Sequence, residues 1–396
     1  SAQRIRDVVL HSMHTLGYLD QQALRTALNT PLALVPLQID NCAPHFKEML
    51  RLFLEKQLGK KALYTQGLVV QTTINRRMQQ AAQDAFAQQY MKLSEKMGSD
   101  IDGALIAIEV NTGQLKALVG GVDFETSKFN RAMQAKRQVG SIIKPILYAA
   151  ALQQGCSFTD THIDEPIELV HNRRVWQPHN YDEKFNGEVT LAYALSHSNN
   201  IVSIKTLLKI GAEHVVPLIK ECGFAGPLHT YPSLALGCID ATLYEAVGMF
   251  NMFANDGVFV PVQYVRWIKN QWGQKIFTQE SMPHRVVSSD IVGRVARVLE
   301  LGLERIKPHF SKQWIASQAI SKTGTTNDWR TCWFIGSTPQ YTTAVYIGFD
   351  DNRPMGTNAY PIHTAFPIWL SFNRAVPSAI KHFTYDPSLQ EITIDE

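Results

Sequence analysis

Three short motifs supply hydroxyl, amine and amide groups that together could carry out acyl transfer. Ser141 and Lys144 form an S-x-x-K motif, Ser198 and Asn200 form an S-x-N motif, and Lys322 opens the run K-T-G-T. A serine hydroxyl is a poor nucleophile unless a base takes its proton. A lysine can be that base only if its pKa falls well below about 10.4, through burial or a neighbouring cation. The motifs therefore predict nucleophilic catalysis by Ser141 with Lys144 as its base.

The S-x-x-K motif falls at the start of a predicted helix over residues 141–153. The i, i+3 spacing would put the Ser141 hydroxyl and the Lys144 amine on one face of that helix. The N–H groups and the positive pole of a helix start would also favour an anion that develops there. The predicted helix would thus supply both the base and part of the charge stabilisation.

The other two motifs supply groups for proton transfer and substrate binding. Ser198 offers a hydroxyl that could relay a proton, and Asn200 an amide that could bind a substrate peptide. On a predicted strand over 319–326, period-2 alternation puts Lys322 and Gly324 on one face. The missing side chain at Gly324 would let another backbone lie close. Lys322 could lower the pKa of Lys144 and could also hold a substrate carboxylate.

The chain carries internal controls for how often such patterns arise by chance. Ser378 and Lys381 form a second S-x-x-K, and Ser371 and Asn373 a second S-x-N. Both fall after the K-T-G, with no third motif to complete a set, so we interpret them as surface helix and tail. K-T-G-T occurs once, and the order S-x-x-K, S-x-N, K-T-G is kept only by the set that begins at Ser141.

Hydrophobic patterning predicts the elements that would hold these motifs. Helices are expected within residues 1–40 and over 46–58, 75–95, 141–153 and 365–375. Extended runs are expected over 67–73, 104–110, 115–119, near 258–278, and over 319–326, 332–337 and 342–349, with helix and loop over most of 155–310. A hairpin, a long mainly helical insert, three strands and a helix predict an α+β fold with an antiparallel sheet flanked by helices.

Composition narrows the functional class only a little. Of the 396 residues, 45% are hydrophobic, which is typical of a globular chain, and a net charge of +3 does not indicate nucleic-acid binding. The five cysteines show neither a disulfide framework nor zinc-ligand spacing. No apolar run reaches 18 residues, and the chain opens directly in a helical pattern, as if cut from a longer protein. Whether the natural protein is anchored in a membrane stays open from these residues.

Other polar and aromatic residues near the motifs have weaker interpretations. His171, His179 and His197 show no metal-ligand spacing, so we predict no metal and no cofactor. Trp176, His179 and Tyr181 could line a substrate groove or simply pack in a loop. No phosphate-binding G-x-x-x-x-G-K-[ST] and no G-x-S-x-G is present.

The motifs in this order resemble the penicillin-recognising serine enzymes, and their flanks are similar to those of class A penicillin-binding proteins. The matching flanks are Gly120-Gly121, Phe129–Ala132, Arg137–Ser141, Trp176–Pro178, Asn180–Asp182, Gly187–Leu191, Leu234–Gly237, Phe253–Gly257, Trp333–Gly336 and Gly348–Asp350. Two positions depart from the family pattern: Val139 stands where proline is usual, and Thr331 where an acid is common. The resemblance implies a penicillin-binding/serine β-lactamase-like fold.

The resemblance also implies a division of the chain into regions. Residues 1–40 resemble the last helices of a lysozyme-like glycosyltransferase domain, and residues 41–100 the linker that precedes a transpeptidase domain. Residues 101–380 would be the transpeptidase (penicillin-binding) domain and residues 381–396 a C-terminal tail. Because most of the glycosyltransferase region is missing, we expect no glycan polymerisation from this chain.

The resemblance implies a role for each motif residue. Ser141 would attack the penultimate D-alanyl carbonyl of a stem peptide, and Lys144 would take its proton. Ser198 and Asn200 would relay protons and hold the donor peptide. Lys322, Thr323 and Thr325, with Gly324 between the threonines, would bind the terminal carboxylate and align the substrate. The oxyanion would lie between the backbone N–H groups of Ser141 and Thr325.

We therefore expect a D,D-transpeptidase that cross-links donor and acceptor stem peptides of peptidoglycan and is acylated by β-lactams. A D,D-carboxypeptidase or β-lactamase would use water as acceptor, and a β-lactam sensor would acylate without turnover, and the motifs alone do not separate these alternatives. The resemblance implies an extracytoplasmic location, with a membrane-anchored parent protein that works in a cell-wall synthesis complex. No nucleic-acid partner is expected.

Overall fold

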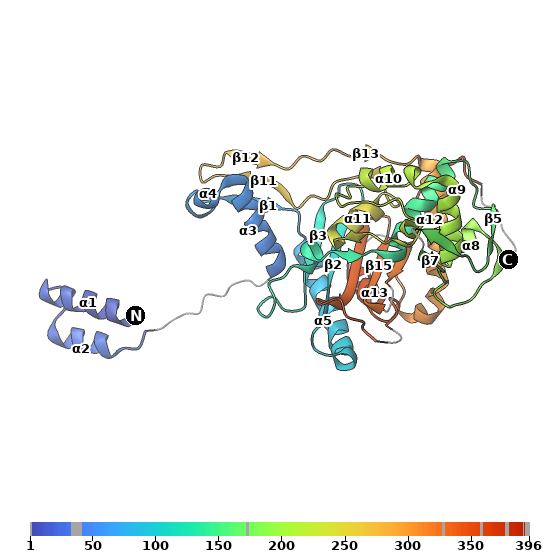
Figure 1. The fold of residues 1–396 in the computed structure, drawn as a ribbon. Coiled ribbons are helices and arrows are strands. Elements are labelled where there is room, and N and C mark those ends of the chain that lie inside the picture. Colours follow the sequence, from blue (N-terminus) through green and yellow to red (C-terminus); the bar gives the residue numbers. More distant parts are fainter. Residues whose placement is uncertain are drawn as a thin grey trace. The chain divides into compact units, whose positions relative to one another are not determined.

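A computed structural model describes residues 2–32, 42–171, 174–326, 329–356, 359–376, 380–390 and 392 (Figure 1). The chain divides into two compact units, 1–41 and 42–396. The first unit is a pair of helices, α1 (Ala2–Thr15) and α2 (Gln21–Asn29). Asp20 caps α2 by accepting a hydrogen bond from the Ala23 N–H at 2.7 Å. Residues 33–40 of the predicted first region lie outside the described residues.

The second unit is built on an antiparallel sheet of five strands in the order β14-β15-β16-β2-β3. The strands are β2 (Ile101–Glu109), β3 (Leu115–Val119), β14 (Ile320–Thr325), β15 (Thr331–Ser337) and β16 (Tyr341–Phe349). The early hairpin thus pairs directly with the late strands, because β2 lies against β16 along its whole length. This confirms the predicted antiparallel sheet.

Both faces of the sheet are covered by helices, so β2 is buried along its length except at Glu109. Along β2, Ile106 and Ile108 pack into one core while Leu105 and Ala107 pack into a second core on the opposite face. The first core is closed by α7 (Lys144–Gln153), α8 (Leu191–Ser196), α9 (Asn200–Ile210), α11 (Leu243–Asn251) and α12 (Ser289–Glu304). The second is closed by α5 (Arg76–Met97) and α13 (Ala365–Ala375). The predicted α+β class is confirmed.

The second unit also contains a smaller sheet, whose strands come from the chain before β2 and between β3 and β14. It contains β1 (Val69–Thr72), β11 (Val265–Lys269) and β12 (Lys275–Thr278) in the order β1-β11-β12. Leu54 of α3 (Pro44–Leu58) packs with Val265 and Ile268 beneath it, and α4 (Lys60–Thr65) follows α3. The extended runs predicted near 67–73 and 258–278 are therefore strands of one sheet, although some 190 residues separate them.

The segment between α7 and β14 contains more strand than the sequence predicts. Besides α10 (Val216–Glu221), it holds the paired strands β5 (Thr161–Asp164) and β8 (Gly187–Thr190) and the paired strands β6 (Leu169–His171) and β7 (Arg174–Trp176). These strands have three or four residues each, too few for period-2 alternation to distinguish them from loop. The remaining elements are α6 (Arg131–Gln134), β4 (Arg137–Gln138), β9 (Asp240–Ala241), β10 (Val258–Phe259), β13 (His284–Arg285) and four 3₁₀ helices, η1 (Gly140–Ile143), η2 (Ala212–His214), η3 (Pro232–Leu236) and η4 (Lys307–Gln313). None of the helices in the described ranges has the length and apolar character needed to cross a membrane.

Candidate active site

Ser141 lies in a 3₁₀ turn rather than at the start of an α-helix. The turn is η1, and α7 begins only at Lys144, with Pro145 in its first turn. The Lys144 N–H donates to the Ser141 carbonyl. Because a 3₁₀ helix has three residues per turn, positions 141 and 144 lie one above the other. The predicted helix start was therefore three residues too early, but the two side chains still share a face.

The turn before Ser141 is held against a neighbouring loop by backbone contacts. The Gly140 N–H donates to the Gly237 carbonyl at 3.2 Å, and the Val139 N–H donates to the Ile239 carbonyl at 3.0 Å. Gly140 has φ +57° and Gly237 has φ +71°, and a Cβ on Gly237 would lie 1.9 Å from the Gly140 carbonyl oxygen. The Val139 hydrogen bond is one that proline, usual here in the family, could not donate.

On its other side the turn packs against β14. A Cβ on Gly324 would lie 2.5 Å from the Val139 carbonyl oxygen, and one on Gly140 would lie 2.9 Å from the Thr325 carbonyl oxygen. The backbone that closely approaches Gly324 is thus the nucleophile turn of the same chain. This contact brings the backbone that carries Ser141 beside Thr325, the two residues predicted to stabilise an oxyanion.

The Lys144 amine is completely buried and is surrounded by the S-x-N loop. Its Nζ donates to the Ser198 carbonyl at 2.6 Å, the Asn199 carbonyl at 3.1 Å and Asn200 Oδ1 at 2.8 Å. Ser198 has φ +58°, a left-handed conformation that non-glycine residues rarely adopt. The loop conformation therefore presents successive oxygen atoms to the amine.

Ser198 lies between the two predicted lysines. Lys322 Nζ donates to Ser198 Oγ at 2.9 Å and to the Thr323 carbonyl at 3.1 Å, while Lys144 Nζ lies 3.4 Å from the same Oγ. One hydroxyl thus bridges the amines of two of the three motifs. Asn200, the asparagine of the S-x-N motif, is held by a hydrogen bond that its Nδ2 donates to the His179 carbonyl at 2.9 Å.

The pKa values of both lysine amines lie below their ordinary range, mainly because the side chains are buried. Burial, and then the neighbouring charge of Lys322, hold the pKa of Lys144 well below its ordinary value. Burial also lowers the pKa of Lys322 to about 7. Among the described residues, neither amine has a carboxylate within ion-pair distance. Lys144 is therefore more readily present as the neutral amine, the form that can accept a proton, than an exposed lysine is.

The remaining predicted groups lie at the accessible side of this arrangement. Ser141 is partly exposed, and its hydroxyl has no hydrogen-bond partner within the described part of the chain. Thr323 and Thr325 are also partly exposed, whereas Gly324 between them is buried. A partly exposed hydroxyl, a buried amine of low pKa and a bridging hydroxyl are the groups that acyl transfer through serine requires.

The second S-x-N and the second S-x-x-K are called the decoy motifs below. The decoy S-x-N lies away from the site around Ser141. Ser371 and Asn373 lie on α13, and Asn373 Nδ2 donates to the Trp369 carbonyl at 2.8 Å in the second core, across the sheet from Lys144. Ser378 of the decoy S-x-x-K lies outside the described residues.

The aromatic residues that could line a substrate groove differ in how far their side chains are exposed. Trp176 packs partly buried against the first core, whereas Tyr181 is 53% exposed. The Trp329 indole N–H donates to the Tyr181 hydroxyl, which joins the segment before the S-x-N loop to the segment after K-T-G-T. His197 stacks on Tyr193, with ring centroids 3.7 Å apart. No group of three or more potential metal ligands lies together within the described residues.

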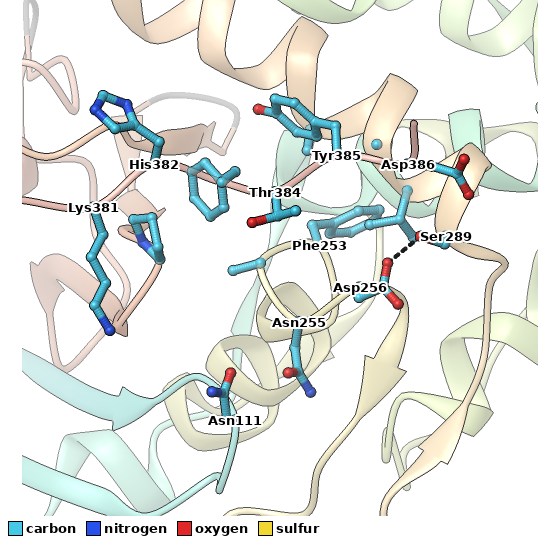
Figure 2. Close-up of a pocket in the computed structure, with 16 residues that line it drawn as sticks. Asn111, Phe253, Asn255, Asp256, Ser289, Lys381, His382, Thr384, Tyr385 and Asp386 are labelled. Atoms are coloured by element: carbon cyan, nitrogen blue, oxygen red, sulfur yellow. Dashed lines mark hydrogen bonds between the residues drawn. The ribbon is translucent and has the colours of Figure 1, made fainter. Parts of the chain in front are cut away.

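A hollow of about 310 Å³ lies elsewhere, between α12 and the C-terminal segment (Figure 2). Phe253 and Tyr385 line it, and the Ser289 hydroxyl donates to the Asp256 carboxylate at its edge. None of its lining residues belongs to the predicted site. We therefore assign the chemistry to Ser141 and its neighbours, where the hydroxyl, amine and amide groups of the predicted motifs lie together.

One buried residue beside the site was not predicted. Asp164 is 1% exposed and accepts hydrogen bonds from three asparagine side chains, including that of Asn199. It lies 35 positions before Asn199 and belongs to no spaced motif. The only sequence signal was an acidic residue at the end of an apolar-polar run, which is too common to single out a site.

Residues 103–365 match the family model described as the penicillin binding protein transpeptidase domain. Penicillin-binding protein 1A of Neisseria meningitidis serogroup A is 36% identical over 287 residues, which cover 69% of this chain and 36% of the relative. Penicillin-binding protein 1B of Vibrio cholerae is 29% identical over 361 residues, which cover 89% and 46%. The chain thus spans about a third to a half of the length of these relatives.

Solved structures share the fold. Penicillin-binding protein 1A from Haemophilus influenzae superposes with a TM-score of 0.88 over 97% of this chain and 78% of that one, at 21% identity. PonA1 from Mycobacterium tuberculosis, solved in complex with penicillin V, gives a TM-score of 0.75 over 88% and 96%, at 23% identity. These likenesses confirm the fold expected from the sequence.

Proposed function

This chain belongs to the penicillin-binding protein transpeptidase family, and from that premise we propose that it is a D,D-transpeptidase acting on peptidoglycan stem peptides through a Ser141 acyl-enzyme. The observation that carries the proposal is the buried Lys144 amine, one 3₁₀ turn from Ser141 and bonded to both carbonyls and the amide of the S-x-N loop. Such an amine can take a serine proton more readily than an exposed lysine, because its pKa is lowered by burial and by Lys322.

In the acylation step, Ser141 Oγ attacks the carbonyl carbon of the penultimate D-alanine and its proton passes to Lys144. The backbone N–H groups of Ser141 and Thr325 stabilise the oxyanion. The peptide C–N bond then breaks, and the departing D-alanine nitrogen receives a proton through the Ser198 hydroxyl. The contacts of Ser198 Oγ with the Lys322 amine at 2.9 Å and the Lys144 amine at 3.4 Å support that relay.

In the second step, an amine of a neighbouring stem attacks the ester carbonyl. A new C–N bond forms, the bond to Ser141 Oγ breaks, and the proton lost by the amine returns to the serine oxygen. A β-lactam imitates the donor: its ring C–N bond breaks, but the nitrogen stays tethered and blocks the acceptor, so the acyl-enzyme is long-lived. Penicillin V bound to the structural neighbour PonA1 is in keeping with this proposal.

Substrate binding is assigned to β14, which is the end strand of the five-stranded sheet. Its outer edge can pair with an extended peptide, because an edge strand offers unpaired N–H and C=O groups. Lys322, Thr323 and Thr325 would bind the terminal carboxylate, with Asn200 on the other side of the peptide. A pKa of about 7 leaves Lys322 able to become charged when a carboxylate arrives.

For the whole protein, we propose the region boundaries given by the family resemblance: glycosyltransferase helices to residue 40, a linker to 100, the transpeptidase domain to 380 and a tail beyond. Residues 391 and 393–396 of that tail lie outside the described residues. We also propose an extracytoplasmic workplace, a membrane-anchored parent protein and partners in cell-wall synthesis. The matches cover only 36% and 46% of these relatives, so a longer parent protein is in keeping with these proposals.

The acceptor is tested by offering the chain a donor peptide that ends in D-Ala-D-Ala together with a different D-amino acid. We expect exchange of the terminal residue, seen by mass spectrometry, and its loss in Ser141→Ala. Release of D-alanine without exchange would make the chain a carboxypeptidase. Rapid hydrolysis of penicillin would make it a β-lactamase, and acylation without any peptide turnover would make it a sensor.

A further inference from the structure

Asp164, the last residue of β5, is a buried carboxylate held entirely by amides. It accepts from Asn180 Nδ2 at 2.8 and 3.0 Å, from Asn199 Nδ2 at 2.8 Å, and from the N–H and Nδ2 of Asn186 at 3.0 and 2.9 Å. In the described part of the chain no lysine or arginine lies within ion-pair distance of it. A buried charge is tolerated only when hydrogen bonds replace its lost water, so these contacts are required as a set.

Two of the three asparagines connect Asp164 to the S-x-N loop: Asn199 belongs to the loop, and Asn180 hydrogen-bonds to it. Asn180 Oδ1 accepts from the Asn200 N–H at 2.9 Å and lies 3.4 Å from the Ile201 nitrogen. Asn199 Oδ1 accepts from the Val202 N–H at 2.9 Å and so caps α9. Since each Nδ2 is committed to the carboxylate, each Oδ1 must point to the start of α9. Asp164 therefore fixes the orientation of both amides.

The same loop carries the oxygen atoms that hold the Lys144 amine. The carbonyls of Ser198 and Asn199 accept from its Nζ, and they do so while Ser198 keeps φ +58°. A strained backbone conformation of this kind persists only where several contacts with the surrounding residues hold it in place. The bonds from Asp164 to Asn199, and through Asn180 to the Asn200 N–H, hold the residues that follow Ser198, and the backbone bonds from the Ser198 and Asn199 N–H groups to Leu195 and Ala194 hold the preceding turn.

We propose that Asp164 is a positioning residue for acylation: through Asn180 and Asn199 it holds the S-x-N loop in the conformation that binds the Lys144 amine, one turn from Ser141. This inference rests on the proposed function, since it concerns the base of that reaction. It adds a residue from the β5–β8 strand pair that belongs to none of the three motifs.

Asn186 provides a matched control. It donates two hydrogen bonds to the same carboxylate but makes no contact with residues 198–200 among the bonds described. Asn180→Ala and Asn186→Ala each remove donors from Asp164, but only Asn180→Ala breaks the path to the loop. Asp164→Asn keeps the shape of the side chain while turning one acceptor into a donor that would face other donors.

The test is the rate constant of acylation at saturating fluorescent penicillin for these three variants, with melting temperatures measured in parallel. We expect Asp164→Asn and Asn180→Ala to acylate about 10- to 100-fold more slowly than wild type, since small misplacements of a catalytic group have effects of that order. Asn186→Ala should acylate at nearly the wild-type rate even where it melts as early as Asn180→Ala. Equal losses in all three, or no loss in Asp164→Asn, would overturn the proposal.

The pH profile separates positioning from general damage. Loosened carbonyls no longer favour the ammonium form of Lys144, so the acid limb of the acylation rate should move to lower pH in Asp164→Asn and Asn180→Ala; an unmoved limb would count against action through Lys144. If wild type formed no adduct at Ser141, the proposed function would fail by itself. A crystal structure of Asp164→Asn would then still decide the positioning role, by whether Ser198 keeps its left-handed conformation.

Discussion

At the scale of single residues, the central problem is an amine that must be uncharged near neutral pH. Burial and the adjacent Lys322 lower the pKa of Lys144, while oxygen atoms of Ser198, Asn199 and Asn200 fix where the amine lies. No single feature suffices, because the acceptors alone would favour the charged form and burial alone would leave the amine unoriented. Lys322 therefore influences the base as well as the substrate.

Replacing Lys322 by methionine should move the acid limb of the acylation rate to higher pH, by about one unit. The variant removes a nearby cation, which is one of the two causes that lower the pKa of Lys144, so that pKa rises. Because only the neutral amine accepts the serine proton, activity is then lost at higher pH as the medium is acidified. Acylation by a fluorescent penicillin between pH 5 and 9 measures it, with exposed Lys209→Met as control. A limb that moves to lower pH would contradict this account.

At the scale of elements, the nucleophile turn is clamped between the loop after η3 and the strand β14. Gly237 and Gly324 make the clamp possible, because a side chain at either position would collide with the backbone of residues 139–140. The contact with β14 also brings the turn beside Thr325. The geometry of the site therefore depends on elements that are far apart in the sequence.

Gly237→Ala should slow acylation about 100-fold, the order expected when a reacting group is displaced by about 1 Å. The added Cβ would lie 1.9 Å from the Gly140 carbonyl oxygen and must push the turn aside. Gly273→Ala is the matched control: its φ is +78°, close to that of Gly237, and nothing lies within 4 Å of its added Cβ. Both variants carry the cost of a left-handed alanine, about 1–2 kcal/mol, but only Gly237→Ala should lose activity. Equal acylation rates in the two would refute the clamp.

The sequence allowed the main sheet and the motif residues to be predicted, because long apolar strands and spaced polar residues leave local signals. It did not reveal that Ser141 lies in a 3₁₀ turn, since one turn of 3₁₀ and one of α-helix have the same residue pattern. The pairing of β1 with β11 and the role of Asp164 depend on contacts between residues far apart in the chain. Such contacts leave no spacing that one sequence can display.

At the scale of the whole molecule, a buried ion-pair cluster joins the sheet to the segment that leads to Ser141. The Arg131 side chain on α6 lies 3.0 Å from Asp102 of β2 and 2.6 Å from Asp350 after β16, and it is 5% exposed. Burial raises the pKa of Asp102, against the effect of the Arg131 charge. Asp350 follows the end of β16, so the cluster fixes one end of the central strands.

Arg131→Met should lower the free energy of unfolding by about 3–5 kcal/mol, because it leaves a buried carboxylate without its partner. Arg285→Met is the comparison, since the Arg285–Asp256 pair is about half exposed on both sides and should contribute about 1 kcal/mol or less. Urea denaturation of both variants measures the difference. Similar losses of unfolding free energy in the two variants would show that the buried cluster stabilises the fold no more than an exposed ion pair does.

The two compact units lead to a separate expectation. All predicted site residues lie within residues 42–396, which have their own hydrophobic cores. A chain without residues 1–41 should therefore be acylated at the wild-type rate, as measured with the same fluorescent penicillin. A large loss of rate would mean that the first unit contributes to the site.

The central claim is that Ser141 is the residue acylated. The most direct measurement is the intact mass of the chain after incubation with a penicillin, followed by peptide mapping of the adduct. We predict one drug molecule per chain, bound at Ser141, in wild type and in the decoy variant Ser371→Ala, and no adduct in Ser141→Ala. An adduct at Ser378, an adduct that persists in Ser141→Ala, or no adduct in wild type would contradict the account.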